Sequence, residues 1–295
     1  MKIYDSCIYY DEDILLDLRF NILDKYIEKF IVVESLFTHS GERKKQNFQI
    51  KNFSKFRKKI EYILLKENPK NIHEINKDDR RKLSKTIDNA NLREIYQRNA
   101  IEKGINQINE HDWVIISDVD EIPNLENLDF NKIKKKIVLF NQLFCCYKFN
   151  LFTKSIDWHG SRMIKKKDLK NPQWLRDIKS KKYSILRADI LFSNKKYRDI
   201  FFVDNGGWHF SYLKDAKGVE EKLKSIRHHV DYQLNPVGTE KLETMIKEKK
   251  LVYNYKLDQR AEDKFTDNEI LENLDFSRLP RYLVENKNKY LKWLN

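Results

Sequence analysis

Residues 112–123 read DWVIISDVDEIP. The run at 113–116 is short, continuous and rich in β-branched side chains, which is typical of a strand buried on both faces. Three carboxylates, Asp118, Asp120 and Glu121, follow that run directly. Acids at the mouth of a buried strand repel one another and are costly to remove from water. The stretch therefore predicts a positive counterpart, and Mn²⁺ or Mg²⁺ is well suited because both ions prefer carboxylate oxygens.

Residues 2–33 predict a β-α-β unit. Strand-forming residues dominate 2–10, the acids at 11–13 suit the first turn of a helix, and apolar residues then recur at helical spacing. A second β-branched run occupies 30–33, and two strands joined through a helix imply a parallel sheet. Further predicted elements are strands at 60–65, within 137–152 and at 183–192, and a helix at about 81–108.

The predicted fold class is α/β, with a Rossmann-like, mostly parallel central sheet flanked by helices and a helical C-terminal extension. The chain has 295 residues, which fits one large domain at 1–235 and a basic, mainly helical extension at 236–295 that packs on the domain or trails it. Two small domains are the alternative. Open α/β sheets bind ligands at the carboxyl ends of their strands, where the acids at 118–121 fall.

The chain is basic, with 58 Lys and Arg against 45 Asp and Glu and a formal net charge of +13. Solubility alone would explain this excess; the functional alternative is an anionic partner such as a nucleotide diphosphate, a membrane surface or nucleic acid. A basic segment at 222–229 stands out, but elsewhere the basic residues are scattered in short runs. This scatter argues against nucleic acid as a partner.

The cysteine content indicates a reducing compartment. Cys7, Cys145 and Cys146 are odd in number and form no Cys-x-x-Cys zinc motif, so buried free thiols are the expectation. The N-terminal residues do not resemble a signal peptide, and no apolar run approaches the ~20 residues that span a bilayer. We therefore expect a cytoplasmic protein that has, at most, a peripheral contact with a membrane.

Several chemistries place an Asp-x-Asp pair such as Asp118 and Asp120 at a strand end. A nucleotide-sugar glycosyltransferase uses the pair to hold Mn²⁺ or Mg²⁺ on the donor diphosphate. A phosphohydrolase of the haloacid-dehalogenase type uses the first Asp as a nucleophile, but its motif ends the first strand and has Thr or Val where this chain has Ile122. That phosphohydrolase, and a basic nucleic-acid-binding protein, are the alternatives to a glycosyltransferase.

The chain resembles glycosyltransferase family 17, which contains the β-1,4-mannosyl-glycoprotein β-1,4-N-acetylglucosaminyltransferase and many bacterial and viral relatives. Two pieces are specific in combination, DVDEIP at 118–123 and GGWHFS at 206–211. Other matching pieces are IYD at 3–5, DILLDLR at 13–19, VVES at 32–35 with Thr38, Ser40, Gly41 and Lys44, YQRN at 96–99 and WHG at 158–160. The resemblance covers about 1–230, and the chain looks like the soluble microbial members because it lacks the membrane anchor of the animal ones.

This resemblance implies a GT-A fold and a metal-dependent, inverting transfer of a sugar, GlcNAc by analogy, from a UDP-sugar to a glycan or lipid-linked acceptor. It also implies that His209 completes a metal shell that Asp118 and Asp120 begin. Arg98 would offset the phosphate charge of the donor. The residues that we expect in donor binding are Glu34, Thr38, Gly41, Lys44, Arg98, Asp118, Gly207 and Trp208.

Inversion requires a general base that deprotonates the acceptor hydroxyl in line with the departing diphosphate. The candidates are Glu121, Asp157, Asp204 and Asp231, and of these Glu121 and Asp204 are the two that we put forward. Glu121 has a structural alternative, in which it stabilises the turn that follows the buried strand.

Overall fold

The computed structural model describes residues 1–76, 78–126, 128–184, 186–255, 264–265 and 269–295. Its strands are β1 (Ile3–Tyr9), β2 (Lys29–Ser35), β3 (Ile60–Leu65), β4 (Trp113–Asp118), β5 (Glu121–Pro123), β6 (Ile137–Phe140), β7 (Gln142–Cys146), β8 (Leu151–Trp158), β9 (Arg162–Lys165), β10 (Ile200–Val203), β11 (Gly207–Ser211) and β12 (Glu272–Asn273). Its α-helices are α1 (Asp13–Leu23), α2 (Lys82–Asn99), α3 (Glu102–Ile105), α4 (Pro172–Asp177), α5 (Ala216–Ser225), α6 (His229–Leu234), α7 (Thr239–Lys247), α8 (Arg281–Glu285) and α9 (Lys287–Tyr290).

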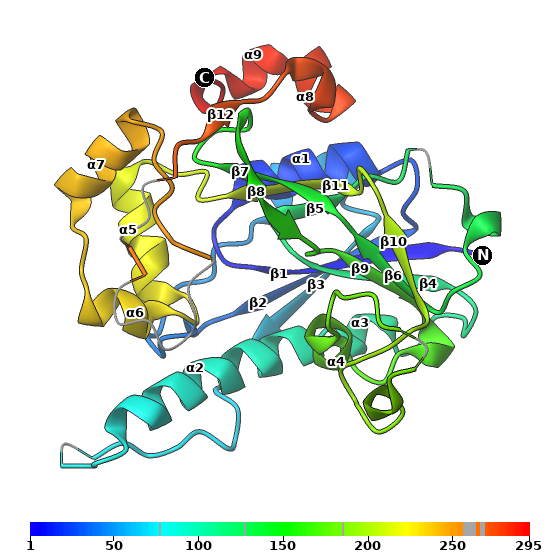
Figure 1. Ribbon diagram of the computed structural model, residues 1–295, viewed down its shortest axis with the longest axis horizontal. Helices are drawn as coiled ribbons and strands as arrows, with labels where there is room; N and C mark the ends of the chain where they lie inside the picture. Colours follow the sequence, from blue (N-terminus) through cyan, green and yellow to red (C-terminus); the bar gives the residue numbers. More distant parts are fainter. Residues whose placement is uncertain (77, 127, 185, 256–263, 266–268) are drawn as a thin grey trace.

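The predicted α/β fold is confirmed. Within the described residues, a 7-stranded sheet has the order β10-β6-β9-β4-β1-β2-β3, and its pairings are parallel except where β9 runs against β4 and β6. Helix α1 covers one face of this sheet, and α2 and α3 cover the other (Figure 1). The buried strand at 113–116 pairs with β1 and lies inside the sheet, as its apolar run predicts.

Alternate side chains of the inner strands pack into two separate cores. Trp113 and Ile115 of β4 join the core beneath α1, together with Leu15 and Phe20 of that helix. Val114 and Ile116 face the other way, into the core that α2 and α3 close with residues such as Ile101. A strand whose side chains are apolar on both faces can be stable only between two such layers.

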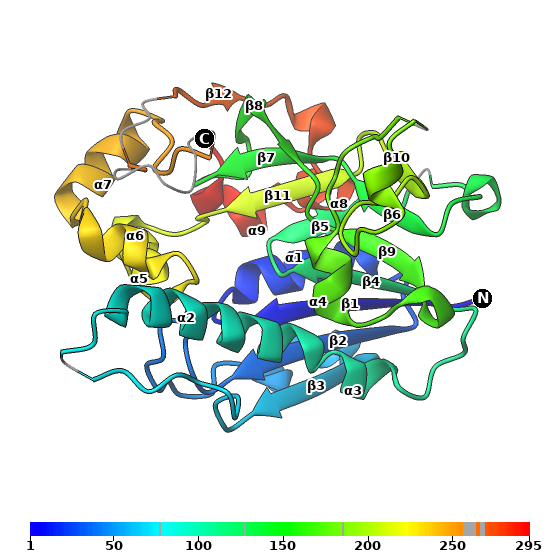
Figure 2. The same cartoon turned by 60° about the horizontal axis from the view of Figure 1, so that its bottom comes forward.

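A second sheet, which the sequence pattern did not predict, has the order β12-β8-β7-β11-β5. Strands β7 and β11 are parallel and the other pairings are antiparallel. The strand arrows of β1, β2, β7 and β11 all point toward the end of the molecule where α5 and α6 lie (Figure 2). Both sheets therefore direct their carboxyl ends to the same region.

The C-terminal residues 236–295 contact the rest of the chain at several places. Leu242 and Met245 of α7 share a core with Phe144 of the second sheet, and β12 extends that sheet along β8. Helix α8 packs on α1, and the Trp208 indole donates a hydrogen bond of 2.7 Å to the carbonyl of Arg278. These contacts tie the predicted extension to both sheets.

Two predicted elements differ from the structure. The strand predicted at 183–192 is wrong: in its described part this segment is irregular, with one short 3₁₀ turn at Ala188–Ile190, because it pairs with neither sheet edge. The helix predicted at 81–108 is divided at Ala100 into α2 and α3. No helix among the described residues combines the length and apolar character that crossing a membrane would require.

Arg19 connects α1 to the turn that carries the acids. Its buried guanidinium donates to both oxygens of Asp5, at 2.7 and 2.5 Å, and to the carbonyls of Asp118 and Glu121, at 3.2 and 2.6 Å. A further bond of 3.0 Å reaches Ser117 Oγ. One buried side chain thus fixes the end of β4 and the start of β5 relative to β1.

The substitution Arg19→Met is expected to lower the free energy of unfolding by about 3–5 kcal/mol, because it leaves the Asp5 carboxylate buried without its partner. Denaturant unfolding followed by circular dichroism measures this change. Arg281→Met is the matched control, since Arg281 is 76% exposed and its pair with Glu285 should contribute less than about 1 kcal/mol. Equal effects of the two substitutions would contradict the structural role of Arg19.

Candidate active site

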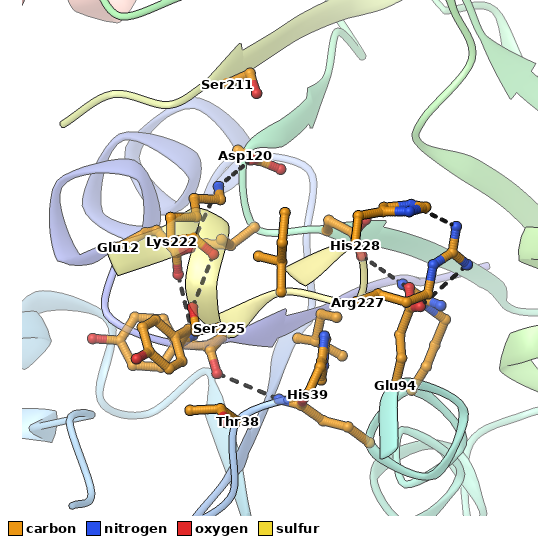
Figure 3. A pocket seen from close by; sticks show the side chains of 18 of the residues that line it. Glu12, Thr38, His39, Glu94, Asp120, Ser211, Lys222, Ser225, Arg227 and His228 are labelled. Atoms are coloured by element: carbon orange, nitrogen blue, oxygen red, sulfur yellow. Dashed lines mark hydrogen bonds and ion pairs between the residues drawn. The ribbon is translucent and has the colours of Figure 1, made fainter. Parts of the chain in front are cut away.

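A cavity of about 470 Å³ opens at the carboxyl ends of β1, β4 and β11. Residues of α2 and α4 line one part of it, and the segment from α5 to α6 lines another. The acids Asp118 and Asp120 both line this cavity, as does His209 from the second sheet (Figure 3 shows part of the lining). The structure therefore brings the three predicted metal ligands to one place.

Asp118 is held between two arginines. Its Oδ1 accepts from Arg98 of α2 and its Oδ2 from Arg176 of α4, both at 2.9 Å. Burial would raise the pKa of Asp118, but Arg176 and Arg98 lower it below its usual range, so the carboxyl is ionised at neutral pH. Both oxygens are committed to guanidinium groups. Asp118 acts in this arrangement as the anchor of two cavity cations.

Asp120 is paired with a lysine and lies beside His209. Its Oδ2 accepts from Lys222 Nζ of α5 at 3.0 Å, and its Oδ1 lies 3.6 Å from His209 Nε2. Burial opposes ionisation, yet Lys222 and His209 hold the pKa of Asp120 well below its usual range. The His209 ring is fixed in orientation because it stacks on Trp158, with ring centroids 4.3 Å apart.

Asp120 and His209 suit a divalent cation better than Asp118 does. Ligand atoms of such a cation lie about 2.1 Å from it, so two atoms no more than about 4.2 Å apart can share it. The Asp120 and His209 atoms meet this condition at 3.6 Å, whereas Asp118 would have to leave both arginines. The described residues hold no cluster of three or more His, Cys, Asp or Glu that fits a metal ion. A cation here would need two protein ligands completed by donor oxygens and water, as Mg²⁺ often has.

The loop expected to line the nucleotide pocket does so only in part. Thr38 and Lys44 line the cavity, whereas Glu34 and Gly41 do not. Glu34 is fully buried, and its carboxylate accepts from Lys44 Nζ, from the backbone of Asn47 at 2.7 Å and from two other donors. Gly41 has a φ of +106°, which favours glycine, in a turn that the Thr38 hydroxyl stabilises. Glu34 and Gly41 therefore shape the loop from outside the cavity.

Gly207 and Trp208, also expected in donor binding, lie away from the cavity lining. Gly207 has a φ of +125°, and a Cβ on it would lie 2.1 Å from the carbonyl oxygen of Ile122. Because Gly207 has no side chain, its backbone can lie close to β5. The glycine is therefore needed for this contact and not for contact with a ligand. Trp208 is buried against the C-terminal segment. Both residues position the strand that carries His209.

Glu121 is fully buried and does not line the cavity. Its carboxylate accepts from the backbone of Asp118 at 2.8 Å, from the Trp158 indole at 3.0 Å and from Arg176 at 2.8 Å. A Cβ on Gly160 would lie 2.3 Å from this carboxyl group, so glycine is needed there. The arrangement corresponds to the structural alternative, in which Glu121 stabilises the turn and orients Arg176.

The other candidate bases also lie outside the cavity lining. Asp157 and Asp204 are exposed, at the end of β8 and in the turn after β10. Asp231 of α6 accepts from Lys264 Nζ and from the Tyr253 hydroxyl, each at 3.1 Å. None of these three carboxylates faces the acids at 118–121 across the cavity.

Several lining residues were not predicted. Among them are the charged residues Glu12, Glu94, Arg176, Asp177 and Lys222. The i,i+4 spacing of Glu94 and Arg98 on a predicted helix could have identified their pair, which has a distance of 2.8 Å. Lys222 falls in the basic segment, but nothing in that segment pointed to Asp120. Arg176 and Asp177 carry no sequence signal that we recognise.

The charges of the cavity are balanced without a ligand. Among the described lining residues, the carboxylates Glu12, Glu94, Asp118, Asp120 and Asp177 match the cations Lys44, Arg98, Arg176, Lys222 and Arg227. Burial and Arg227 lower the pKa of His228 to about 4, so this lining histidine is neutral near pH 7. A diphosphate, with two negative charges, would need one divalent cation to restore the balance.

The fold and the cavity define an α/β protein with a polar, charge-lined pocket at the carboxyl edge of its sheet, which is where such sheets bind their ligands. The sequence profile of Glycosyltransferase family 17 matches residues 1–294. The chain belongs to Glycosyltransferase family 17 and is an enzyme that transfers a sugar from a donor to an acceptor. The match includes the C-terminal segment, for which the sequence pattern alone showed no resemblance. No curated protein matches the chain.

Proposed function

We propose that this glycosyltransferase is metal-dependent and inverting, and that it moves a sugar, N-acetylglucosamine by family resemblance, from a UDP-sugar to a glycan or lipid-linked acceptor. The observation that carries the proposal is the pair of Asp120 and His209, 3.6 Å apart in a cavity whose cations and carboxylates are balanced. A UDP-sugar and one divalent cation enter such a cavity together without leaving net charge. The UDP-sugar alone or the cation alone would leave an uncompensated charge in the cavity, which is unfavourable.

In this proposal each cavity group has a task in donor binding. Asp120 and His209 hold Mn²⁺ or Mg²⁺, which when bound neutralises the diphosphate and stabilises the departing UDP. Arg98 and Arg176, fixed by Asp118, supply further positive charge beside the diphosphate. Glu121 keeps Arg176 in place through its two bonds to that guanidinium.

We propose Asp177 as the general base. Of the five cavity carboxylates, Glu94, Asp118 and Asp120 pair with cavity cations, and Glu12 lies 3.8 Å from Lys222. Asp177 ends α4, and its cation partner Lys195, at 3.3 Å, does not line this cavity. Its Oδ1 accepts from the neutral side chain of Gln173 at 2.9 Å, and the Asp177 side chain is 37% exposed, so an acceptor hydroxyl could reach the carboxylate from solvent. A base needs such an accessible lone pair within hydrogen-bond reach of the hydroxyl.

Calorimetry with UDP and Mn²⁺ tests the proposed function. We expect UDP to bind tightly with Mn²⁺ present and weakly with a chelator, and UDP-N-acetylglucosamine to be turned over to UDP. Metal-independent or undetectable UDP binding would refute the metal-dependent donor site. Release of phosphate from simple phosphoesters would instead support the phosphohydrolase alternative. Tight, salt-sensitive binding of DNA or RNA would support the nucleic-acid alternative.

Three exposed apolar residues, Leu186, Leu191 and Phe192, suggest how the enzyme reaches a membrane that carries its acceptor. We call these three residues the apolar tip. These side chains are 93%, 74% and 90% exposed, on the segment that was predicted as a strand. Residues 179–198 carry seven Lys and Arg and one Asp, so the segment that bears the tip has a net positive charge. Apolar side chains within a basic rim bind anionic membrane surfaces. We propose that the tip makes the peripheral membrane contact, which suits a lipid-linked acceptor.

The apolar tip should bind the protein to vesicles. Sedimentation with phosphatidylglycerol vesicles should pellet the wild type, and replacing all three tip residues by serine should weaken binding at least about tenfold, because each buried apolar side chain contributes about 1.5–3 kcal/mol. The matched control replaces Leu234 and Ile270, which are also exposed but lie elsewhere. Equal binding to phosphatidylcholine, or an unaffected tip variant, would refute the proposal.

The cellular location that we propose is the cytoplasm. Cys7, Cys145 and Cys146 are buried free thiols, and burial raises the pKa of Cys7 to about 12. Thiols that stay protonated and buried are compatible with a reducing compartment.

A further inference from the structure

Lys222 lies beside two largely buried carboxylates, which need a positive partner when no ligand is bound. Its Nζ is 3.0 Å from Asp120 Oδ2 and 3.8 Å from Glu12 Oε1, and its side chain is only 15% exposed. Figure 3 shows the Lys222 side chain reaching from α5 toward Asp120, with Glu12 beside it. Burial would make Glu12 and Asp120 costly to ionise, and the single ammonium group offsets that cost for both. Lys222 is thus a counter-cation supplied by the chain itself.

The same ammonium group opposes a divalent cation at Asp120. It is bonded to Oδ2 of this carboxylate, whose other oxygen, Oδ1, lies 3.6 Å from His209 Nε2. A cation bound between Asp120 and His209 would also repel the ammonium at close range. The metal and the Lys222 ammonium therefore compete for Asp120, unless the ammonium moves.

The Lys222 side chain has a second place to go once a donor is present. It lines the cavity and lies on a flexible four-carbon stem, with Nζ 5.6 Å from the centre of the Tyr212 ring. A diphosphate held beside Asp120 would offer new anionic oxygens within its reach. We propose that Lys222 is a two-position cation, which neutralises Asp120 in the free enzyme and moves to the donor diphosphate when the metal takes its place.

This proposal rests on the proposed metal-dependent donor site and adds a coupling between its two ligands. The metal alone must displace Lys222 from Asp120 and leave the ammonium without that partner, so it binds weakly. With a diphosphate present, the displaced ammonium gains a partner, and metal binding strengthens. Because such coupling is reciprocal, the metal strengthens donor binding by the same factor.

Titration calorimetry of Lys222→Met tests the coupling. Mn²⁺ is titrated into the protein with and without saturating UDP. In the wild type, UDP should tighten Mn²⁺ binding by about tenfold or more, within the usual range for coupled sites. In Lys222→Met, Mn²⁺ should bind the UDP-free protein about tenfold more tightly than in the wild type, and the effect of UDP should shrink. Unchanged Mn²⁺ affinity and coupling in the variant would overturn the proposal.

Thermal unfolding provides a second measurement, because the variant leaves Asp120 and Glu12 without their counter-cation. Mn²⁺ alone should raise the Tm of Lys222→Met more than that of the wild type, since the metal replaces the missing charge. Lys214→Met is the matched control: Lys214 pairs with Asp11 at 2.7 Å, does not line the cavity and should leave Mn²⁺ binding unchanged. An equal Mn²⁺ effect on the Tm of all three proteins would also overturn the proposal.

The two proposals can fail separately. If wild-type protein binds no UDP in the presence of Mn²⁺, the proposed donor site is refuted. The proposed movement of Lys222 to a donor diphosphate is then refuted with it. If wild-type protein binds UDP with Mn²⁺ but Lys222→Met shows the same coupling, the donor site stands and the role of Lys222 is refuted.

Discussion

Replacing Asp120 by asparagine is expected to reduce kcat/KM for sugar transfer by about 10³-fold. The amide keeps the shape of the side chain but removes the charge that holds the metal beside His209. Stabilisation of a leaving group by a metal ion is worth several kcal/mol, and each 1.4 kcal/mol is tenfold in rate. Initial rates of UDP release measure the loss, and calorimetry should show UDP binding that no longer depends on Mn²⁺.

Asp11→Asn is the control for this experiment, because Asp11 pairs with Lys214 near the same end of the sheet without lining the cavity. It should retain wild-type rates and Mn²⁺-dependent UDP binding. The Asp120 variant must also remain folded, which near-wild-type circular dichroism would establish. Mn²⁺-dependent binding that survives in Asp120→Asn would show that the metal lies elsewhere.

The position of the acids could be predicted because their sequence context is physically unusual. A buried β-branched run followed by Asp118 and Asp120 is costly unless a ligand or a cation compensates, and this argument needs only local sequence. The parallel sheet followed similarly from the β-α-β pattern at 2–33. Both predictions rest on residues that are neighbours in the chain.

The cations that surround the acids could not be found in this way. Arg176 reaches Asp118 from α4 and Lys222 reaches Asp120 from α5, 58 and 102 residues along the chain. No periodicity links a helix residue to a strand end at such separations, and many other lysines and arginines are indistinguishable from them in the sequence. Their role becomes visible only when the fold brings the side chains together.

Glu34, Glu121 and Gly207 illustrate a different limit. Each belongs to a motif that resembles the family, and each was expected to contact ligand or substrate. In the structure they make buried contacts with the protein itself: Glu34 with Lys44, Glu121 with Arg176 and Gly207 with the backbone of β5. A motif identifies residues that a site depends on, but it does not separate those that line the cavity from those that support it.

The segment at 183–192 shows why hydrophobic pattern alone misassigns an element. Its apolar residues match a strand, but a strand needs a partner edge, and the described part of this segment pairs with neither sheet. Leu186 and Phe192 remain exposed as a result. Large apolar side chains that are exposed in this way indicate an interaction surface, which the strand assignment would have hidden.

Replacing Asp177 by asparagine is expected to lower kcat by about 10²–10⁴-fold while the affinity for UDP and Mn²⁺ stays unchanged. The range is that of general-base catalysis, since the variant retains the metal and the arginines but loses the group that accepts the hydroxyl proton. Separate measurement of kcat and of UDP affinity by calorimetry distinguishes this outcome from a loss of donor binding. Asp168→Asn, whose carboxylate lies 3.6 Å from Lys136 and outside the cavity lining, should have no effect.

The same experiment separates Asp177 from the bases suggested by the sequence. Asp157→Asn and Asp204→Asn should retain turnover if the base must line the cavity, because both carboxylates are exposed away from it. Glu121→Gln should instead lower donor affinity together with kcat, because its carboxylate holds Arg176 at 2.8 Å. A loss of kcat in Asp204→Asn with turnover intact in Asp177→Asn would transfer the role to Asp204. It would also require Asp204 to approach the cavity when donor and acceptor bind.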